Sequence, residues 1–119
     1  MVNLNYRDSR PIYEQIRDGY RDLLISGGIL PGEKLPSVRE LATQLAINPN
    51  TIQRAYRELE AEGYIYSVPG KGAFAASQAE VSSQRKTMLF AQFDQAAAEL
   101  IFLGVKSEEL YNRIKGVKK

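Results

Sequence analysis

The sequence predicts a mainly α-helical chain that carries one small β-hairpin. Two short amphipathic helices are expected near the middle of the chain, joined by a turn of a few residues. Two short apolar segments follow them, separated by a Pro-Gly-Lys-Gly turn. The last third of the chain repeats apolar residues at helical spacing. A helix-turn-helix followed by a hairpin is a winged helix-turn-helix, so we assign such a domain to residues 1–76 and a helical dimerisation or effector region to 77–119.

The first helix is expected to begin near Pro11, because proline is favoured in a first helical turn. Ser9 lies just before it and strengthens this assignment. Apolar side chains then recur on one face until the pair Gly27–Gly28 ends the helix. Prolines and a glycine within residues 31–36 indicate an extended connection to the next helix.

The second and third helices both carry start signals. Ser37 and Glu40 form the pattern of a capping box, in which each side chain bonds the backbone of the other residue. After a turn at residues 46–47, Asn48 can cap the third helix and Pro49 can occupy its first position. The third helix is therefore expected over residues 49–62, with Gly63 as its left-handed terminator.

The third helix has two distinct faces. One face is apolar and can pack on a small core, with Ile52, Ala55, Tyr56 and Leu59. The opposite face carries amide and guanidinium groups, which can form paired hydrogen bonds with adenine and guanine. These residues are Asn50, Gln53, Arg54 and Arg57. A polar helical face is more often only solvated, but the preceding capped helix and the following hairpin favour DNA recognition.

The hairpin is expected to pair residues 64–66 with residues 73–75. Lys71 lies at its tip between Gly70 and Gly72, where the backbone can approach DNA and a lysine can neutralise phosphate. A plain hairpin turn would also favour glycine, and this alternative stays open. Alternate strand residues share a face, so Tyr64 and Tyr66 are expected to pack within the protein rather than to stack on bases.

Arg39 is a second candidate for a DNA contact outside the third helix. It lies early in the second helix, near the positive end of the helix dipole, where a phosphate or a base can approach. The alternative is an ordinary surface arginine paired with Glu40 or Glu62.

The C-terminal region has more apolar residues than one helix face can hold. After a polar stretch at 76–86, a long helix is expected to end at Gly104, and Ser107 can start a last helix. A helix that is apolar on more than one side requires burial on more than one side. We therefore expect a dimer interface here, although packing against the last helix is an alternative. The expected interface residues are Leu89, Phe90, Phe93, Ala97, Leu100 and Ile101.

Composition restricts the function further. The 119 residues contain no cysteine and no histidine, which argues against disulfides, thiolate metal sites and the commonest general base. We expect no catalytic site, metal or cofactor. The N-terminus does not resemble a signal peptide and no apolar run is long enough for a bilayer, so a cytoplasmic location is expected. Net charge is only +2, and a basic face must therefore arise from local arrangement.

Residues 11–75 resemble the winged helix-turn-helix domain of the GntR family of bacterial transcription regulators. The similarity lies in the run PGEKLPSVRELA, the helix NPNTIQRAYRELEAEGYI and the turn GKG. The short helical tail resembles the YtrA-type subfamily, whose members dimerise through two C-terminal helices and commonly repress operons of ABC-type transporters. The resemblance implies DNA contacts at Arg39, Asn50, Thr51, Gln53, Arg54, Gly70, Lys71 and Gly72.

One departure from the family changes the expected recognition. Many relatives place a base-contacting arginine where this chain has Pro49, so recognition must depend on Asn50, Gln53 and Arg54. The expected partners are a palindromic double-stranded operator and a second copy of the chain. A small-molecule effector stays open, although the missing histidine and cysteine argue against a transition metal. A winged-helix adaptor that binds protein instead of DNA is the alternative function.

Overall fold

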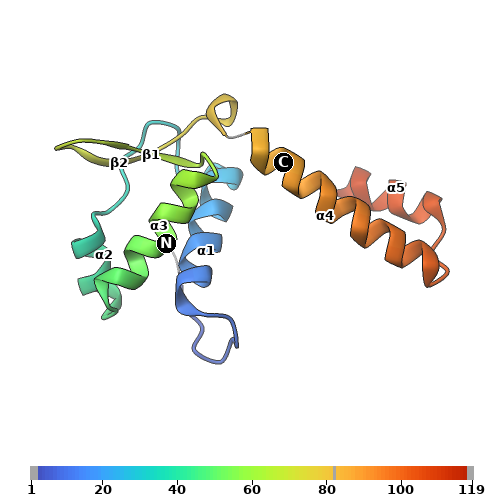
Figure 1. The fold of residues 1–119 in the computed structure, drawn as a ribbon, viewed down its shortest axis with the longest axis horizontal. Coiled ribbons are helices and arrows are strands. Elements are labelled where there is room, and N and C mark those ends of the chain that lie inside the picture. The colour runs from blue at the N-terminus through green and yellow to red at the C-terminus, as the bar shows by residue number, and fades with distance from the viewer. Residues whose placement is uncertain (1–2, 82, 118–119) are drawn as a thin grey trace. The chain divides into compact units, whose positions relative to one another are not determined.

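The structure is a computed structural model that describes residues 3–81 and 83–117. The chain divides into two compact units, residues 1–82 and 83–119, and each is considered by itself. Among the described residues, the first unit contains three α-helices, a two-stranded sheet and a short 3₁₀ helix, η1 (Gln78–Glu80), and the second contains two α-helices (Figure 1). No helix in the described part of the chain has the length and apolar character needed to cross a membrane.

Helices α1 (Ile12–Ser26) and α2 (Val38–Leu45) form where the sequence predicts them. Pro11 caps α1 without a side-chain hydrogen bond, and Gly27 ends it with a φ of 85°. The capping box of α2 is confirmed: the Glu40 amide donates to Ser37 Oγ at 3.0 Å, and the Ser37 amide donates to Glu40 Oε1 at 3.2 Å. These bonds satisfy amides that an uncapped helix would leave without partners.

Helix α3 (Pro49–Ala61) also has the predicted start. The Asn50 amide donates to Asn48 Oδ1 at 2.8 Å, and Pro49 occupies the first turn. The helix ends at Ala61, one residue before the predicted end, and Gly63 follows with a φ of 86°.

The turn between α2 and α3 contains a feature that the sequence did not indicate. Ala46 has a φ of 56° and a ψ of 48°, and it is the only described residue other than glycine with a positive φ. Its amide donates to Thr43 O at 3.3 Å, and the Ile47 amide donates to Ala42 O at 2.9 Å. A left-handed residue thus ends α2 and redirects the chain into α3.

One core holds the three helices and the sheet together. Its fully buried aliphatic side chains come from α1, α2, α3 and the connection before α2. Tyr20 and Tyr56 meet edge to face with ring centroids 5.9 Å apart, and the Tyr56 hydroxyl donates to Pro36 O at 2.8 Å. Burial raises the pKa of both phenols, so they stay protonated. The fully buried large residues are Ile16, Leu35, Leu41, Ile52 and Leu59.

The sheet forms the wing. Strands β1 (Ile65–Val68) and β2 (Gly72–Ala75) pair antiparallel, and Tyr66 stacks on its partner Phe74 with ring centroids 5.8 Å apart. Tyr64 lies just before β1 and is buried as predicted, whereas Tyr66 is exposed and packs only by stacking on Phe74 at the surface of the wing. The connection before α2 adds unpredicted pairing, because the Leu35 amide donates to Ala73 O at 2.9 Å.

The second unit consists of α4 (Ser83–Phe102) and α5 (Ser107–Gly116), separated by Gly104 with a φ of 98°. The predicted polar stretch at 76–86 contains η1 and the first turn of α4. None of the described residues of α4 or α5 is buried in the single chain. This helical pair therefore leaves most of its apolar surface exposed.

Candidate nucleic-acid interface

The exposed face of α3 brings the predicted base-contacting groups together. Asn50, Gln53, Arg54 and Arg57 are all exposed, whereas Thr51 is half-buried. The opposite face is fixed in the core by Ile52, Ala55, Tyr56 and Leu59. Helical periodicity therefore places the polar groups outward, as the sequence predicts.

A groove separates α3 from the wing and has a volume of about 650 Å³. Gln53 and Arg57 line it from α3, and Lys71 lines it from the turn of the wing. Residues 37–38, at the start of α2, also line the groove. The structure thus brings three predicted elements around one concave surface: the polar helix, the wing tip and a helix N-terminus.

Glu60 is a groove residue that the sequence analysis missed. It lines the groove, and its Oε2 accepts from the Ser67 amide of β1 at 3.3 Å. This bond links α3 to the wing. Its position one turn after Tyr56 and two turns after Gln53 could have identified it as a residue on the wing side of the helix.

The wing turn requires its glycines for conformational reasons. Gly70 and Gly72 have φ values of 76° and 117°, which residues with a side chain rarely adopt. A Cβ on Gly72 would also lie 3.0 Å from Lys34 Cε. The Lys71 amide donates to Val68 O at 2.9 Å, while its side chain is exposed. The turn therefore explains both glycines and leaves the Lys71 ammonium available to a partner.

Arg39 is exposed at the start of α2. The two carboxylates that were its alternative ion-pair partners interact with other residues. Glu40 is held in the capping box, and accepting from Ser37 lowers its pKa. Glu62 accepts from Arg21 Nη2 at 2.8 Å. The geometry thus favours an Arg39 guanidinium that is free to meet an external anion.

Arg54 is exposed but makes contacts within the domain. Its Cζ lies 3.8 Å from the centre of the Tyr13 ring, and its Nη2 donates to the Tyr13 hydroxyl at 3.1 Å. Its Nε lies 3.6 Å from Glu58 Oε2. The role of Tyr13 could not be predicted from the sequence, because Tyr13 and Arg54 are 41 positions apart.

Basic side chains of α1 are neutralised by carboxylates. Arg17 Nη1 lies 2.7 Å from Glu58 Oε1, and Arg17 Nε lies 2.9 Å from Asp18 Oδ1. Arg21 pairs with Asp18 and Glu62. These ion pairs join α1 to α3 and use carboxylates that would otherwise offset the arginines of the exposed face. A nearly neutral domain can therefore present a locally basic surface.

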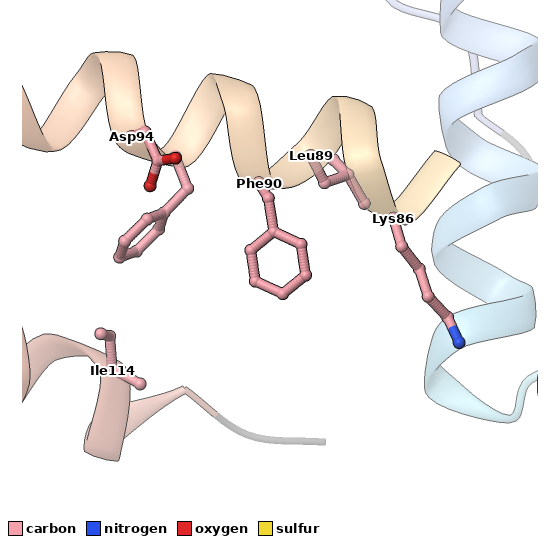
Figure 2. Close-up of a pocket in the computed structure, with 6 residues that line it drawn as sticks. Lys86, Leu89, Phe90, Asp94 and Ile114 are labelled. Atoms are coloured by element: carbon pink, nitrogen blue, oxygen red, sulfur yellow. The ribbon is translucent and has the colours of Figure 1, made fainter. Parts of the chain in front are cut away.

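The second unit contains an apolar groove of about 680 Å³ between α4 and α5. In Figure 2, Phe90 of α4 and Ile114 of α5 point into the space between the helices. Phe90 is 69% exposed and Phe93 49% exposed. Most of the predicted dimer residues are similarly accessible, and only Ala97 is half-buried. The groove residues are Lys86, Leu89, Phe90, Phe93, Asp94 and Ile114.

The sequence of the first unit matches a known family. The profile described as "Bacterial regulatory proteins, gntR family" matches residues 12–75, which is more than half of the chain. The protein belongs to the gntR family. The matched residues include α1, the helix-turn-helix and the wing, so all residues of the candidate interface of this gntR-family chain lie within the matched segment.

Full-length relatives agree with this assignment. The chain is 40% identical to the HTH-type transcriptional repressor YtrA of Bacillus subtilis (strain 168) over 119 residues, covering 98% of this chain and 92% of that protein. A transcriptional antiterminator from Listeria monocytogenes EGD-e has a TM-score of 0.80 at 34% identity, covering 98% and 88% of the two chains. The GntR-family factor YtrA from Sulfolobus acidocaldarius has a TM-score of 0.68 at 34% identity, covering 82% and 97%. The predicted YtrA-type resemblance and winged-helix fold are thereby confirmed.

A DNA complex of a more distant relative bears on the interface. The DNA-binding domain of AraR, crystallised with operator ORE1, has a TM-score of 0.55 at 33% identity, covering 64% of this chain and 93% of that one. The family and these relatives consist of transcriptional regulators rather than enzymes. The chain is accordingly a DNA-binding transcriptional regulator of the gntR family.

Proposed function

We propose that the protein is a homodimeric repressor that recognises a palindromic operator. Helix α3 enters the major groove, and the wing contacts the backbone and minor groove beside it. The observation that carries the proposal is the exposed face of α3, which presents Asn50, Gln53, Arg54 and Arg57 beside the groove to the wing. Amide and guanidinium groups on one helical face suit hydrogen bonding to base edges.

Phosphate contacts are assigned to the periphery of this face. Lys71 is an exposed cation that lines the groove at the wing tip, and Arg39 is an exposed cation at the start of α2, next in sequence to the groove residue Val38. Thr51, Gly70 and Gly72 are assigned to backbone contacts, because a hydroxyl and exposed backbone amides can donate to phosphate oxygens. Such contacts fix the register of the helix, while the α3 side chains supply the sequence preference.

The second unit supports the dimer. The expected interface residues expose 39% to 69% of their area in a single chain, apart from the half-buried Ala97. An exposed apolar surface of this kind is typical of a protein–protein interface. We assign it to a second copy of the chain, since a twofold axis would place two α3 helices on half-sites about 34 Å apart.

The proposed direction of regulation is supported by one relative, and the proposed target genes rest on the YtrA-type resemblance. The Bacillus subtilis YtrA protein is a transcriptional repressor and matches nearly the full length of this chain. Repression of the protein's own operon, or of an operon for an ABC-type transporter, is therefore the regulation that we propose.

Selection of duplexes from a random-sequence pool tests this function without knowledge of the operator. The wild-type protein is expected to enrich a palindrome, called here the selected duplex, which should also occur upstream of its own gene. The variant carrying Gln53→Ala and Arg54→Ala should bind without enriching that palindrome. If wild-type protein enriches no sequence, the proposal fails and the protein-binding adaptor becomes the better explanation.

A further inference from the structure

Arg54 is held by a ring from another helix. Its guanidinium lies 3.8 Å from the centre of the Tyr13 ring and donates to the Tyr13 hydroxyl at 3.1 Å, while its side chain stays 57% exposed. We propose that Tyr13 of α1 is a positioning residue for DNA recognition, which holds Arg54 in the conformation that meets the base edge. This inference rests on the proposed function and adds α1 to the recognition machinery.

The contact reduces the freedom of a long side chain before DNA arrives. An unrestrained arginine loses rotamer freedom when it is immobilised at an interface, and this loss opposes binding. Stacking on an aromatic face restricts the guanidinium, and the hydroxyl bond fixes its rotation over the ring. Tyr13 is itself half-buried and packs against the core, so it provides a rigid surface.

Tyr13 holds Arg54 without cancelling its charge. A carboxylate partner would compete with DNA, and Glu58 lies near enough, with its Oε2 3.6 Å from Arg54 Nε. However, Arg17 Nη1 approaches the other Glu58 oxygen to 2.7 Å. Helix α1 therefore acts twice: Arg17 balances the carboxylate, and the neutral Tyr13 orients the guanidinium.

Arg57 provides a matched comparison on the same helix. It is also exposed, but it lines the groove to the wing instead of stacking on α1. A change at Tyr13 should therefore alter the contribution of Arg54 and leave that of Arg57 intact. A general effect on the fold would alter both.

The first test is a pair of double-mutant cycles in the full chain, with affinity for the selected duplex measured by fluorescence anisotropy at fixed salt. Tyr13→Leu is expected to weaken binding about threefold to thirtyfold, the range of a cation–π contact. This loss should disappear in the Arg54→Ala background and persist in the Arg57→Ala background. Tyr13→Phe keeps the aromatic ring and should therefore bind the selected duplex with most of the wild-type affinity.

Two results in these cycles would overturn the inference. Equal losses in both arginine backgrounds would indicate that Tyr13 only supports the fold, which a lower Tm would corroborate. Tighter binding by Tyr13→Leu would show that the ring withholds Arg54 from DNA.

A measurement on the free protein separates this inference from the proposed function. Relaxation of the arginine ¹⁵Nε groups should show Arg54 more restricted than Arg57 in the wild-type protein. Tyr13→Leu should abolish this difference, and Tyr13→Phe should retain most of it. If Arg54 is as mobile as Arg57 in the wild-type protein, Tyr13 does not position it, whatever the chain binds. Failure to select a duplex would instead refute the proposed function, whereas the restriction of Arg54 by Tyr13 would still be decided by this relaxation measurement.

Discussion

Ala46→Gly should stabilise the DNA-binding unit, although most substitutions destabilise proteins. Ala46 ends α2 with a φ of 56° and a ψ of 48°. In this region the Cβ of an L-residue approaches the following carbonyl, at a cost of about 1–2 kcal/mol. Ala46 is exposed, so removing its methyl group sacrifices little packing.

The gain is partly offset in the unfolded state. Glycine gives the unfolded chain more conformations than alanine, which costs roughly 0.4–1 kcal/mol. The difference leaves a net stabilisation of about 0.7 kcal/mol, which corresponds to a Tm increase of roughly 3–5 °C for a domain of this size. The bonds from the amides of residues 46 and 47 do not involve the methyl group and should persist.

Thermal denaturation followed by circular dichroism would measure the effect, at one fixed protein concentration because the chain is proposed to dimerise. Ala61→Gly is the matched control, since Ala61 is also exposed but lies in α3 with right-handed geometry. That variant should lower Tm. A Tm decrease in Ala46→Gly comparable to that of Ala61→Gly would refute the strain argument.

Four further predictions concern the cap, the interface and the tail. Ser37→Ala should lower the stability of the domain by about 1 kcal/mol in chemical denaturation, because it removes the acceptor for the Glu40 amide. The capping box lowers the pKa of Glu40, so the stability that the Glu40 carboxylate contributes is present above its pKa in the unfolded chain and is lost as pH falls through its pKa in the folded chain. The Tm difference between wild type and Glu40→Gln should therefore shrink in acid. A Tm difference that does not change with pH would contradict this. Lys71→Ala should weaken binding to all duplexes alike and reduce the salt slope by about one, whereas a change in base preference would show that Lys71 contacts bases. Phe93→Asp should give a monomer in sedimentation, and a dimer of unchanged strength would remove Phe93 from the proposed interface.

Local chemistry explains why the helices could be predicted from sequence. The Ser37–Glu40 box and the Asn48-Pro49 start depend on residues within three positions of one another. The two faces of α3 follow from helical periodicity alone. These same patterns were sufficient to place the polar side chains on one exposed face.

The contacts that adjust the interface depend on tertiary packing. Tyr13 and Arg54 meet only because α1 packs on α3, and Glu60 bonds Ser67 only because the wing folds back beside α3. The pairing of Leu35 with Ala73 likewise joins distant segments. Ala46 is a different case, because its left-handed conformation is set by the turn that both helices require and not by its own preference. No sequence period encodes such contacts.

The central claim is that α3 distinguishes one DNA sequence from another. The most direct test is the ratio of affinities for the selected duplex and a scrambled duplex of equal length, at one stated salt concentration. We expect the wild-type ratio to be at least about 10³. Gln53→Ala combined with Arg54→Ala should bring the ratio close to one, while Lys71→Ala should preserve it. A wild-type ratio near one, or a high ratio that survives the α3 substitutions, would contradict the account.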